Sequence, residues 1–213
     1  MSNILSLDTT LGGCSVALSN GASRHIVERN QQTSQLSAMV EAVLVEDNLS
    51  FDDLDAYAVT IGPGSFTGVR IGLAFVRGLA LAVKKPIHSI SGLELLAYQA
   101  IEAGVEGTIL AAINAYREHV YRQHFKIENG LPVALSKPFE LPNTDSAPAD
   151  STVVGDAGEF FPGHPQLTLL PDAAALARYA EKLPLPALHS KPAPLYLRAP
   201  DAKVQNGNLT IAQ

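Results

Sequence analysis

The chain is poor in cysteine, tryptophan and basic residues: it has one cysteine and no tryptophan among 213 residues. A single cysteine excludes a disulfide framework and a zinc site built from thiolates. Its 15 basic residues face 21 acidic ones, which gives a net charge of -6. Such a charge argues against tight binding of nucleic acid phosphates by this chain alone, so we expect any contact with RNA to require a partner.

Several catalytic patterns are also missing from the sequence. The six histidines form no His-x-x-x-His pair and no His-Glu-x-x-His motif, so no zinc hydrolase ligands are visible. There is no Gly-x-x-x-x-Gly-Lys-Ser/Thr loop either, so a bound phosphate would lack the usual lysine. Ser65 in Gly-Pro-Gly-Ser-Phe does not fit Gly-x-Ser-x-Gly, and we interpret it as a helix N-cap. Cys14 is interpreted as a core residue. We therefore predict no catalytic and no metal-binding residue.

The hydrophobic content of 46% and the mean hydropathy of +0.12 are typical of a globular protein with a real core. No basic segment precedes the first apolar run, and the apolar stretch 69–83 is interrupted by Arg70 and Arg77. Neither export nor membrane insertion is therefore indicated, and we expect a cytoplasmic protein.

The first half predicts the order βββαβαβα. Strands are expected at 4–8, 14–19 and 23–28, a helix from Ser34, a strand at 55–61, a helix at 66–83 and a strand at 86–90. A third helix begins after Ser91, which has capping-box spacing to Glu94, and ends at Gly104. In the first helix the apolar residues recur with helical period and share one face. They are Leu36, Met39, Val40, Val43 and Leu44.

The second half begins the same plan again and stops early. Strands are expected at 109–114, 120–127, 131–140 and 153–154, and the later helix at 172–183. The segment 184–200 carries five prolines and precedes a polar tail at 206–208, so we expect an extended carboxyl terminus. These patterns place a domain boundary near residue 104, with domains at 1–104 and 105–213.

Two turns could hold a phosphate group. Asp8, Thr9 and Thr10 end the first strand directly before a glycine turn, where hydroxyls and backbone N–H groups can meet a phosphate. The alternative, that they only satisfy turn amides, has equal weight. The turn 155–158 is the second candidate and is equally consistent with a plain turn. Arg117 and Glu118 form a charged turn that either faces a partner or is simply solvated.

The run 62–72, Gly-Pro-Gly-Ser-Phe-Thr-Gly-Val-Arg-Ile-Gly, is the most specific pattern in the chain. Gly68 and Gly72 lie one helical turn apart and would let a second helix or a ligand approach closely. Arg70 and Arg77 share one face. The alternative is a strand-to-helix turn packed on its own core, which the five glycines between Gly62 and Gly78 make less favourable.

Together with residues 4–10 and 194–198, this run resembles the bacterial TsaB family, well over the first hundred residues and thinly through the middle. The resemblance implies an α/β protein of two RNase H-like halves, the second truncated, in the actin-like ATPase superfamily. It implies a part in making threonylcarbamoyladenosine beside the tRNA anticodon. In that family the transfer to tRNA belongs to the related subunit TsaD, and TsaB is its required non-catalytic partner.

The resemblance also implies partners. The first two helices would pack on their counterparts in a TsaD-type protein as a four-helix bundle, or on a second copy as a homodimer when the chain is alone. In such a bundle Arg70 and Arg77 could pair with acidic groups of the partner. Replacement of Gly72 by leucine would then abolish assembly and leave the monomer folded. A TsaE-type ATPase is a further expected partner, and tRNA would be contacted only through the complex. The residues expected at the partner interface are Leu36, Met39, Val40, Gly64, Phe66, Thr67, Gly68, Arg70, Ile71, Gly72, Ala74 and Arg77.

Departures from the family pattern limit what can be carried over. The two histidines that TsaD uses for metal correspond to Thr33 and Ser37, and the usual Asp-Ala-Arg is Asn114-Ala115-Tyr116. The alternative function is an autonomous ATPase or phosphotransferase, motivated by Asp8 and its neighbours. A peptidase, an older label sometimes attached to the family, would need ligands or a triad that the sequence does not supply. We expect no cofactor on this chain alone, and ATP or ADP only at a subunit interface.

Overall fold

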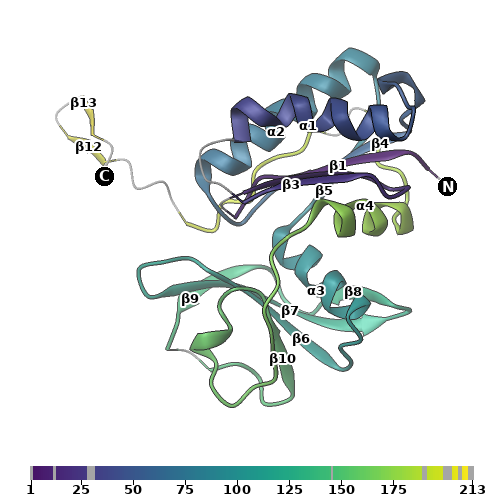
Figure 1. Ribbon diagram of the computed structural model, residues 1–213. Coiled ribbons are helices and arrows are strands. Elements are labelled where there is room, and N and C mark those ends of the chain that lie inside the picture. The colour runs from purple at the N-terminus through teal and green to yellow at the C-terminus, as the bar shows by residue number, and fades with distance from the viewer. Residues whose placement is uncertain are drawn as a thin grey trace.

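The computed structural model describes residues 2–11, 13–27, 32–144, 146–188, 191–198, 203–205 and 208–210. Its first sheet has the strand order β3-β2-β1-β4-β5 (Figure 1). The first three strands are antiparallel neighbours, and β4 and β5 add in parallel. The bounds are β1 Ile4–Asp8, β2 Cys14–Leu18, β3 Ser23–Ile26, β4 Ala56–Thr60 and β5 Ile87–Ile90. Residue 28, where we expected the third strand to end, lies outside the described residues.

Alternation along β1 divides the first sheet into two buried faces. Leu5 and Leu7 pack in the core under helices α1 and α2, whereas Ile4 packs with residues of α3 and α4. Successive strand side chains point to opposite faces, so both faces need a cover. The helices are α1 Gln32–Glu46, α2 Phe66–Val83, α3 Gly92–Glu102 and α4 Ala173–Lys182. Figure 1 shows α1 and α2 on one side of this sheet and α4 on the other.

Caps define where the helices begin. The Ser65 hydroxyl accepts the Gly68 N–H at 3.2 Å, and the Ser91 hydroxyl accepts the Glu94 N–H at 3.0 Å. The Asp172 carboxylate accepts the Ala175 N–H at 3.0 Å. Side-chain acceptors at these positions satisfy N–H groups that have no partner within the helix. The predicted N-cap role of Ser65 and the expected start of the third helix are therefore confirmed.

The second sheet has the order β11-β10-β6-β7-β8. β8 pairs with the last residues of β7, and β9 pairs with the first residues of the same strand. β10 and β11 are parallel to β6, while β7 and β8 are antiparallel neighbours. The single strand expected at 131–140 is wrong, because β8 ends and the chain turns before β9 begins. The bounds are β6 Thr108–Asn114, β7 His119–Glu128, β8 Leu131–Ala134, β9 Phe139–Pro142, β10 Ser151–Val154 and β11 Gln166–Leu167.

The two sheets repeat one topology, which confirms the duplicated plan and its truncated second copy. Each has three antiparallel strands followed by two parallel ones. The first copy places α2 between its parallel strands, and the second has only the 3-10 turn Gly158–Phe160 there. The first copy also has the 3-10 turn Phe51–Asp53 before β4. The fold is therefore the expected α/β arrangement of two related halves.

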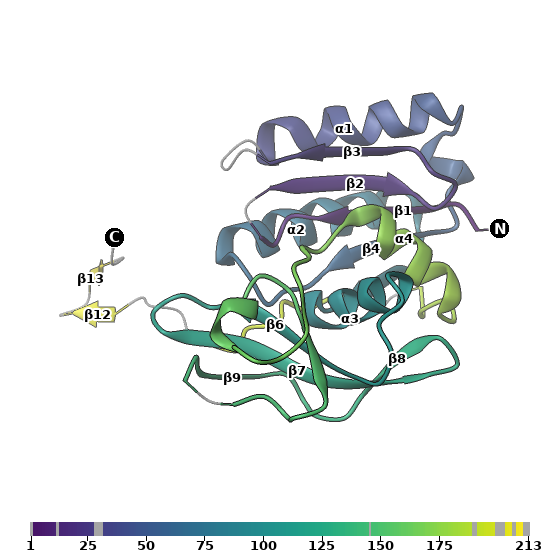
Figure 2. The ribbon, with the colours of Figure 1, turned by 60° about the horizontal axis from the view of Figure 1, so that its bottom comes forward.

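The helices do not follow the boundary expected near residue 104. Helix α3 lies between the sheets (Figure 2), with Leu95 in a core shared with α4 and Leu96 in the core of the second sheet. Helix α4 comes late in the chain but returns to the first sheet, where the Ser15 hydroxyl accepts the Ala173 N–H at 3.0 Å. The division 1–104 and 105–213 thus places one sheet in each half, but residues of both halves share one hydrophobic core.

The segment 191–198 runs back across both halves. The Leu195 N–H donates to the Ile61 carbonyl at 2.7 Å, and Arg198 Nη1 donates to the Ala115 carbonyl at 3.1 Å. Arg198 Nε also binds the Glu140 carboxylate at 2.9 Å. The chain then forms a small two-stranded sheet of β12 Lys203–Gln205 and β13 Asn208–Thr210, away from the main body in Figure 1. The expected polar tail at 206–208 lies mostly outside the described residues.

Candidate partner-binding surface

Thr9 is the residue that the glycines of α2 accommodate. A Cβ on Gly68 would lie 2.0 Å from the Thr9 carbonyl oxygen, and one on Gly72 would lie 2.5 Å from Thr9 Oγ1. Both glycines are buried. The expectation that Gly68 and Gly72 leave room for a partner is therefore corrected: they let α2 approach the end of β1. Replacing Gly72 by leucine would disturb the fold itself.

Three further residues of the expected interface belong to the core. Leu36, Met39 and Val40 on α1 are buried beneath the helix, against the first sheet. The helical period correctly grouped them on one face, and that face points inward. They are thus unavailable to a partner in this fold. The expected interface is corrected at these positions as well.

The outer strip of α2 contains three residues of the expected interface, Thr67, Ile71 and Ala74, and the exposed Phe66, Arg70 and Arg77 of that interface lie beside it. The strip runs along one side of the helix, and its residues are exposed or half-buried: Thr67, Ile71, Ala74, Gly78 and Leu81. Leu81 is 82% exposed, and Val45 on the neighbouring helix α1 is 77% exposed. Large exposed apolar side chains that gather on one surface are typical of protein interaction sites.

Helix α2 as a whole is long and apolar. It has 18 residues and a mean hydropathy of 1.6, so its length and composition alone would suffice to cross a membrane. The helix packs on the first sheet through Gly68, Val69, Gly72, Leu73 and Val76. Five of its 18 residues (28%) are buried, and five more are partly buried against the same core: Ile71, Phe75, Leu79, Ala80 and Val83. The remaining residues form one exposed side of the helix.

Arg70 and Arg77, which the sequence treats alike, have different surroundings. The Arg70 guanidinium carbon lies 3.6 Å from the centroid of the Phe66 ring, and Arg70 Nε donates to the Tyr196 hydroxyl at 3.0 Å. Arg77 instead donates to the carbonyl oxygen of Pro192. Both arginines therefore hold the segment 191–198 on α2. Gly64, the remaining residue of the expected interface, packs against Thr10 of the first turn.

The candidate phosphate-binding residues are buried, and their side chains form hydrogen bonds within the protein. The Thr9 hydroxyl donates to the Gly68 carbonyl at 2.7 Å, and the Thr10 hydroxyl donates to Asp8 Oδ1 at 2.7 Å. Thr60 donates to the same oxygen at 2.5 Å. Burial raises the pKa of the Asp8 carboxyl, and nearby Asp172 raises it further. Phosphate binding by Asp8, Thr9 and Thr10 stays a prediction that would require these bonds to break.

Asp8 and Asp172 also line a cavity of about 280 Å³ together with His25 and Cys14. Cys14 is buried, as expected of a core residue. Within the described ranges, no group of three or more histidine, cysteine, aspartate or glutamate side chains lies close enough to hold a metal ion. Among the described residues that line this cavity, Asp8 and Asp172 are the acidic ones.

The turn 155–158 is tied to the strand beside it. A Cβ on Gly155 would lie 2.1 Å from the Ala112 carbonyl oxygen, and Asp156 Oδ1 accepts the Asn114 N–H at 2.8 Å. The opposite turn holds Tyr116, Arg117 and Glu118 at φ values of 56°, 53° and 63°. Left-handed backbone is unfavourable for such residues, so neighbouring contacts must hold this turn. Sequence patterns contained no signal for that conformation.

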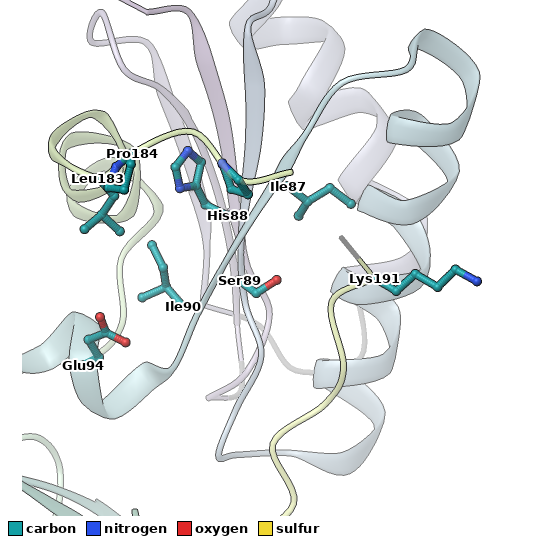
Figure 3. A pocket seen from close by; sticks show the side chains of 9 residues that line it. Ile87, His88, Ser89, Ile90, Glu94, Leu183, Pro184 and Lys191 are labelled. Atoms are coloured by element: carbon teal, nitrogen blue, oxygen red, sulfur yellow. The ribbon is translucent and has the colours of Figure 1, made fainter. Parts of the chain in front are cut away.

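A second cavity, of about 420 Å³, lies at the edge strand β5 beside the end of α4 (Figure 3). His88 stands among Ile90, Leu183 and Pro184 in this view, with Glu94 below. Its imidazole is 3% exposed, and Nε2 has no hydrogen-bond partner among the described residues. Burial lowers the pKa of His88. The cavity combines apolar residues with the imidazole and with Ser89, Glu94 and Lys191, and sequence reasoning did not identify it.

Comparison with known proteins adds family information to this geometry. The family model described as "TsaD: tRNA N6-adenosine threonylcarbamoyltransferase" matches residues 25–135. A protein of Haemophilus influenzae named tRNA threonylcarbamoyladenosine biosynthesis protein TsaB is 39% identical over 55% of this chain and 51% of its own length. The Escherichia coli K12 protein of the same name is 38% identical over 60% of this chain and 57% of its own length.

These alignments span only about half the length of the two curated relatives. A solved structure titled "YeaZ from Pseudomonas aeruginosa" matches more completely. It superposes with a TM-score of 0.82 and 30% identity, and the match covers 92% of this chain and 100% of that chain.

Proposed function

Because this chain belongs to the TsaB family, we propose that it takes part in threonylcarbamoyladenosine biosynthesis as a subunit that binds a TsaD-type enzyme and supplies no reacting group. The outer strip of α2 carries this proposal. It presents exposed apolar side chains on a rigid helix, which is the arrangement that a permanent partner covers.

The match to the TsaD family model supports the choice of partner. Residues 25–135 include both α1 and α2, so a TsaD-type protein is expected to carry related helices. Two pairs of related helices can bury their outer faces against each other as a four-helix bundle. Val45 on α1 and Leu81 on α2 are the large apolar side chains that such a bundle would cover.

A charge placed on the outer strip tests this proposal. We expect Leu81→Asp to remove the complex with the TsaD-type protein of the same cell, because it would bury an unpaired carboxylate in an apolar interface. Leu135→Asp is the matched control, since Leu135 is also exposed, at 54%, but lies in the second half after β8. Size-exclusion chromatography with light scattering measures the mass of each mixture.

A heteromeric mass with wild type and Leu135→Asp, lost with Leu81→Asp, is the expected result. If wild type and the TsaD-type protein elute separately at micromolar concentrations, the subunit proposal fails. If Leu81→Asp assembles like wild type, the interface lies elsewhere. Circular dichroism establishes that each variant is folded.

The proposal is compatible with the two further partners that we expect. A TsaE-type ATPase would join the assembled pair, and tRNA would be held by the complex and not by this chain, whose net charge is -6. A homodimer through the same helices would form when the TsaD-type protein is missing.

A further inference from the structure

Phe66, Arg70 and Tyr196 form a stacked triad at the start of α2. The Phe66 and Tyr196 rings stack with centroids 5.0 Å apart and an interplanar angle of 29°. The Arg70 guanidinium carbon lies 3.6 Å from the Phe66 ring centroid. Both rings are 39% exposed, so the triad stands at the surface. It joins a residue of the carboxyl-terminal segment to the outer strip of α2.

The triad fixes the orientation of the Arg70 guanidinium. Its Nε donates to the Tyr196 hydroxyl at 3.0 Å, and one of its faces lies on Phe66. No other hydrogen bond or ion pair joins Arg70 to the part of the chain that the structure describes. A guanidinium has five N–H donors, so the terminal nitrogens keep donors for another molecule. Such a preoriented pair of donors suits a carboxylate.

The charge pattern of α2 determines which partner can supply that carboxylate. The helix contains Arg70 and Arg77 and no acidic residue. A two-fold contact of α2 with the same helix of a second copy would bring arginines together without an acidic group from either α2. In a bundle that also includes α1, a second copy would add the exposed Glu41 and Glu46, of which Glu46 is already paired with Arg24. Like charges at an interface are unfavourable, whereas a helix that carries an aspartate or glutamate is complementary.

We propose that the stacked triad binds a carboxylate side chain of the TsaD-type partner and thereby favours that partner over a second copy of this chain. This inference rests on the proposed function. In the complex, Arg70 contacts the carboxylate, and Tyr196 is a positioning residue that holds the guanidinium in place. The carboxyl-terminal segment is then part of the interface and not only a connection between the halves.

Binding affinities test the triad. Titration calorimetry of the full chain against the TsaD-type protein is performed with wild type, Arg70→Gln, Tyr196→Phe and the charge-matched control Lys137→Gln, an exposed lysine of the second half. We expect Arg70→Gln to weaken binding at least about tenfold and to reduce its salt dependence. Tyr196→Phe keeps the ring and loses the hydroxyl, so we expect a smaller loss of roughly threefold.

The outcomes separate this inference from the proposed function. If Arg70→Gln binds with wild-type affinity while Leu81→Asp does not bind, the proposed carboxylate contact of the triad is wrong. The subunit proposal is then unaffected. Absence of binding by wild type overturns both. A loss in Lys137→Gln equal to that in Arg70→Gln overturns the site and points to a general charge effect.

Partner preference has its own measurement. We expect any self-association of the chain, followed by light scattering, to strengthen as salt rises from about 50 mM to about 500 mM, because salt screens repulsion between the arginines. Arg70→Gln is measured beside wild type and is expected to respond less to salt, which separates the arginines from the general repulsion between chains of net charge -6. Self-association that is tighter at low salt and is weakened by Arg70→Gln would overturn the preference, since the triad would then find its carboxylate on a second copy.

Discussion

The carboxyl group of Asp8 joins the ends of two parallel strands. Its Oδ1 accepts hydrogen bonds from Thr10, which follows β1, and from Thr60 at the end of β4. The group is nevertheless almost fully buried, and burial outweighs these hydrogen bonds and raises its pKa. A buried carboxyl of this kind costs stability once it ionises.

The sign of the resulting pH dependence follows from the raised pKa. As pH rises from the ordinary carboxyl value of 3.8 through the folded value, the folded protein retains the proton longer than the unfolded chain, so wild type loses stability. Asp8→Asn keeps an oxygen acceptor and does not titrate. We expect the free energy of unfolding of Asp8→Asn, minus that of wild type, to increase as pH rises from about 4 to about 8.

Urea unfolding at several pH values measures this difference. Asp150→Asn serves as the control, because Asp150 is exposed. A difference between Asp8→Asn and wild type that does not change with pH would contradict a raised pKa at this position.

At the same scale, the sequence identified Asp8, Thr9 and Thr10 as a group of polar residues in one turn, and the structure brings them together. It could not show that their hydroxyls are already used by Gly68 and Asp8. Those partners are distant in the sequence or depend on side-chain rotamers, and a local pattern contains neither. Tyr196 is a similar case, because it meets Phe66 across 130 residues of chain.

Helix α2 combines a buried glycine strip with an exposed apolar one. The predicted bounds 66–83 agree with Phe66–Val83, because Ser65 provides a cap and the apolar run is continuous. The orientation of the glycines could not be predicted, since a period of 3.6 groups residues on faces without saying which face meets the sheet. Gly72 and Gly78, both in this helix, therefore differ in what surrounds them.

These two glycines provide a matched pair of substitutions. We expect Gly72→Ala to lower the free energy of unfolding by about 1–3 kcal/mol, because its Cβ would lie 2.5 Å from Thr9 Oγ1. A Cβ on Gly78 would have no atom within 4 Å, and this glycine is exposed. We expect Gly78→Ala to raise the free energy of unfolding by about 0.4–1 kcal/mol.

Thermal or urea unfolding of both variants checks the pair. Equal effects of the two substitutions would show that α2 does not approach Thr9 as described. Gly78 lies on the outer strip, so binding of the TsaD-type protein by Gly78→Ala also tests whether the partner contacts this position.

The whole molecule is a duplicated fold in which only the first copy keeps its full set of helices. The sequence showed the repeat through its turns and strands, and the topology of both sheets confirms it. The order of the elements along the chain could not predict which half each helix packs against. Helix α4 follows β11 in sequence and yet packs on β1 and β2, because its apolar side covers the Ile4 face of the first sheet.

The internal hydrogen bonds of the candidate phosphate turns predict how the isolated chain responds to nucleotide. The hydroxyls of Thr9 and Thr10 are bonded internally, and Asp156 of the opposite turn is bonded to Asn114. We therefore expect the isolated chain to give no saturable heat with magnesium ATP up to about 1 mM in titration calorimetry. ATP or ADP would bind only where a second subunit completes the site, so the same titration is repeated with the TsaD-type protein present.

Saturable binding of magnesium ATP by the isolated chain would contradict this expectation. It would also favour the alternative of an autonomous ATPase or phosphotransferase. Binding in the mixture, with no binding to either protein alone, would place the nucleotide at the subunit interface.

The return of α4 to the first sheet has a consequence for synthesis on the ribosome. The five strands of that sheet are complete at Ile90, and α3, which packs on part of the Ile4 face, ends at Glu102. Helix α4, which covers the rest of this face, ends at Lys182. At translation speeds of about 5–20 residues per second, this part of the face waits on the order of 5–20 seconds for its cover. During that interval the nascent chain exposes an apolar sheet surface, which makes it a substrate for ribosome-associated chaperones.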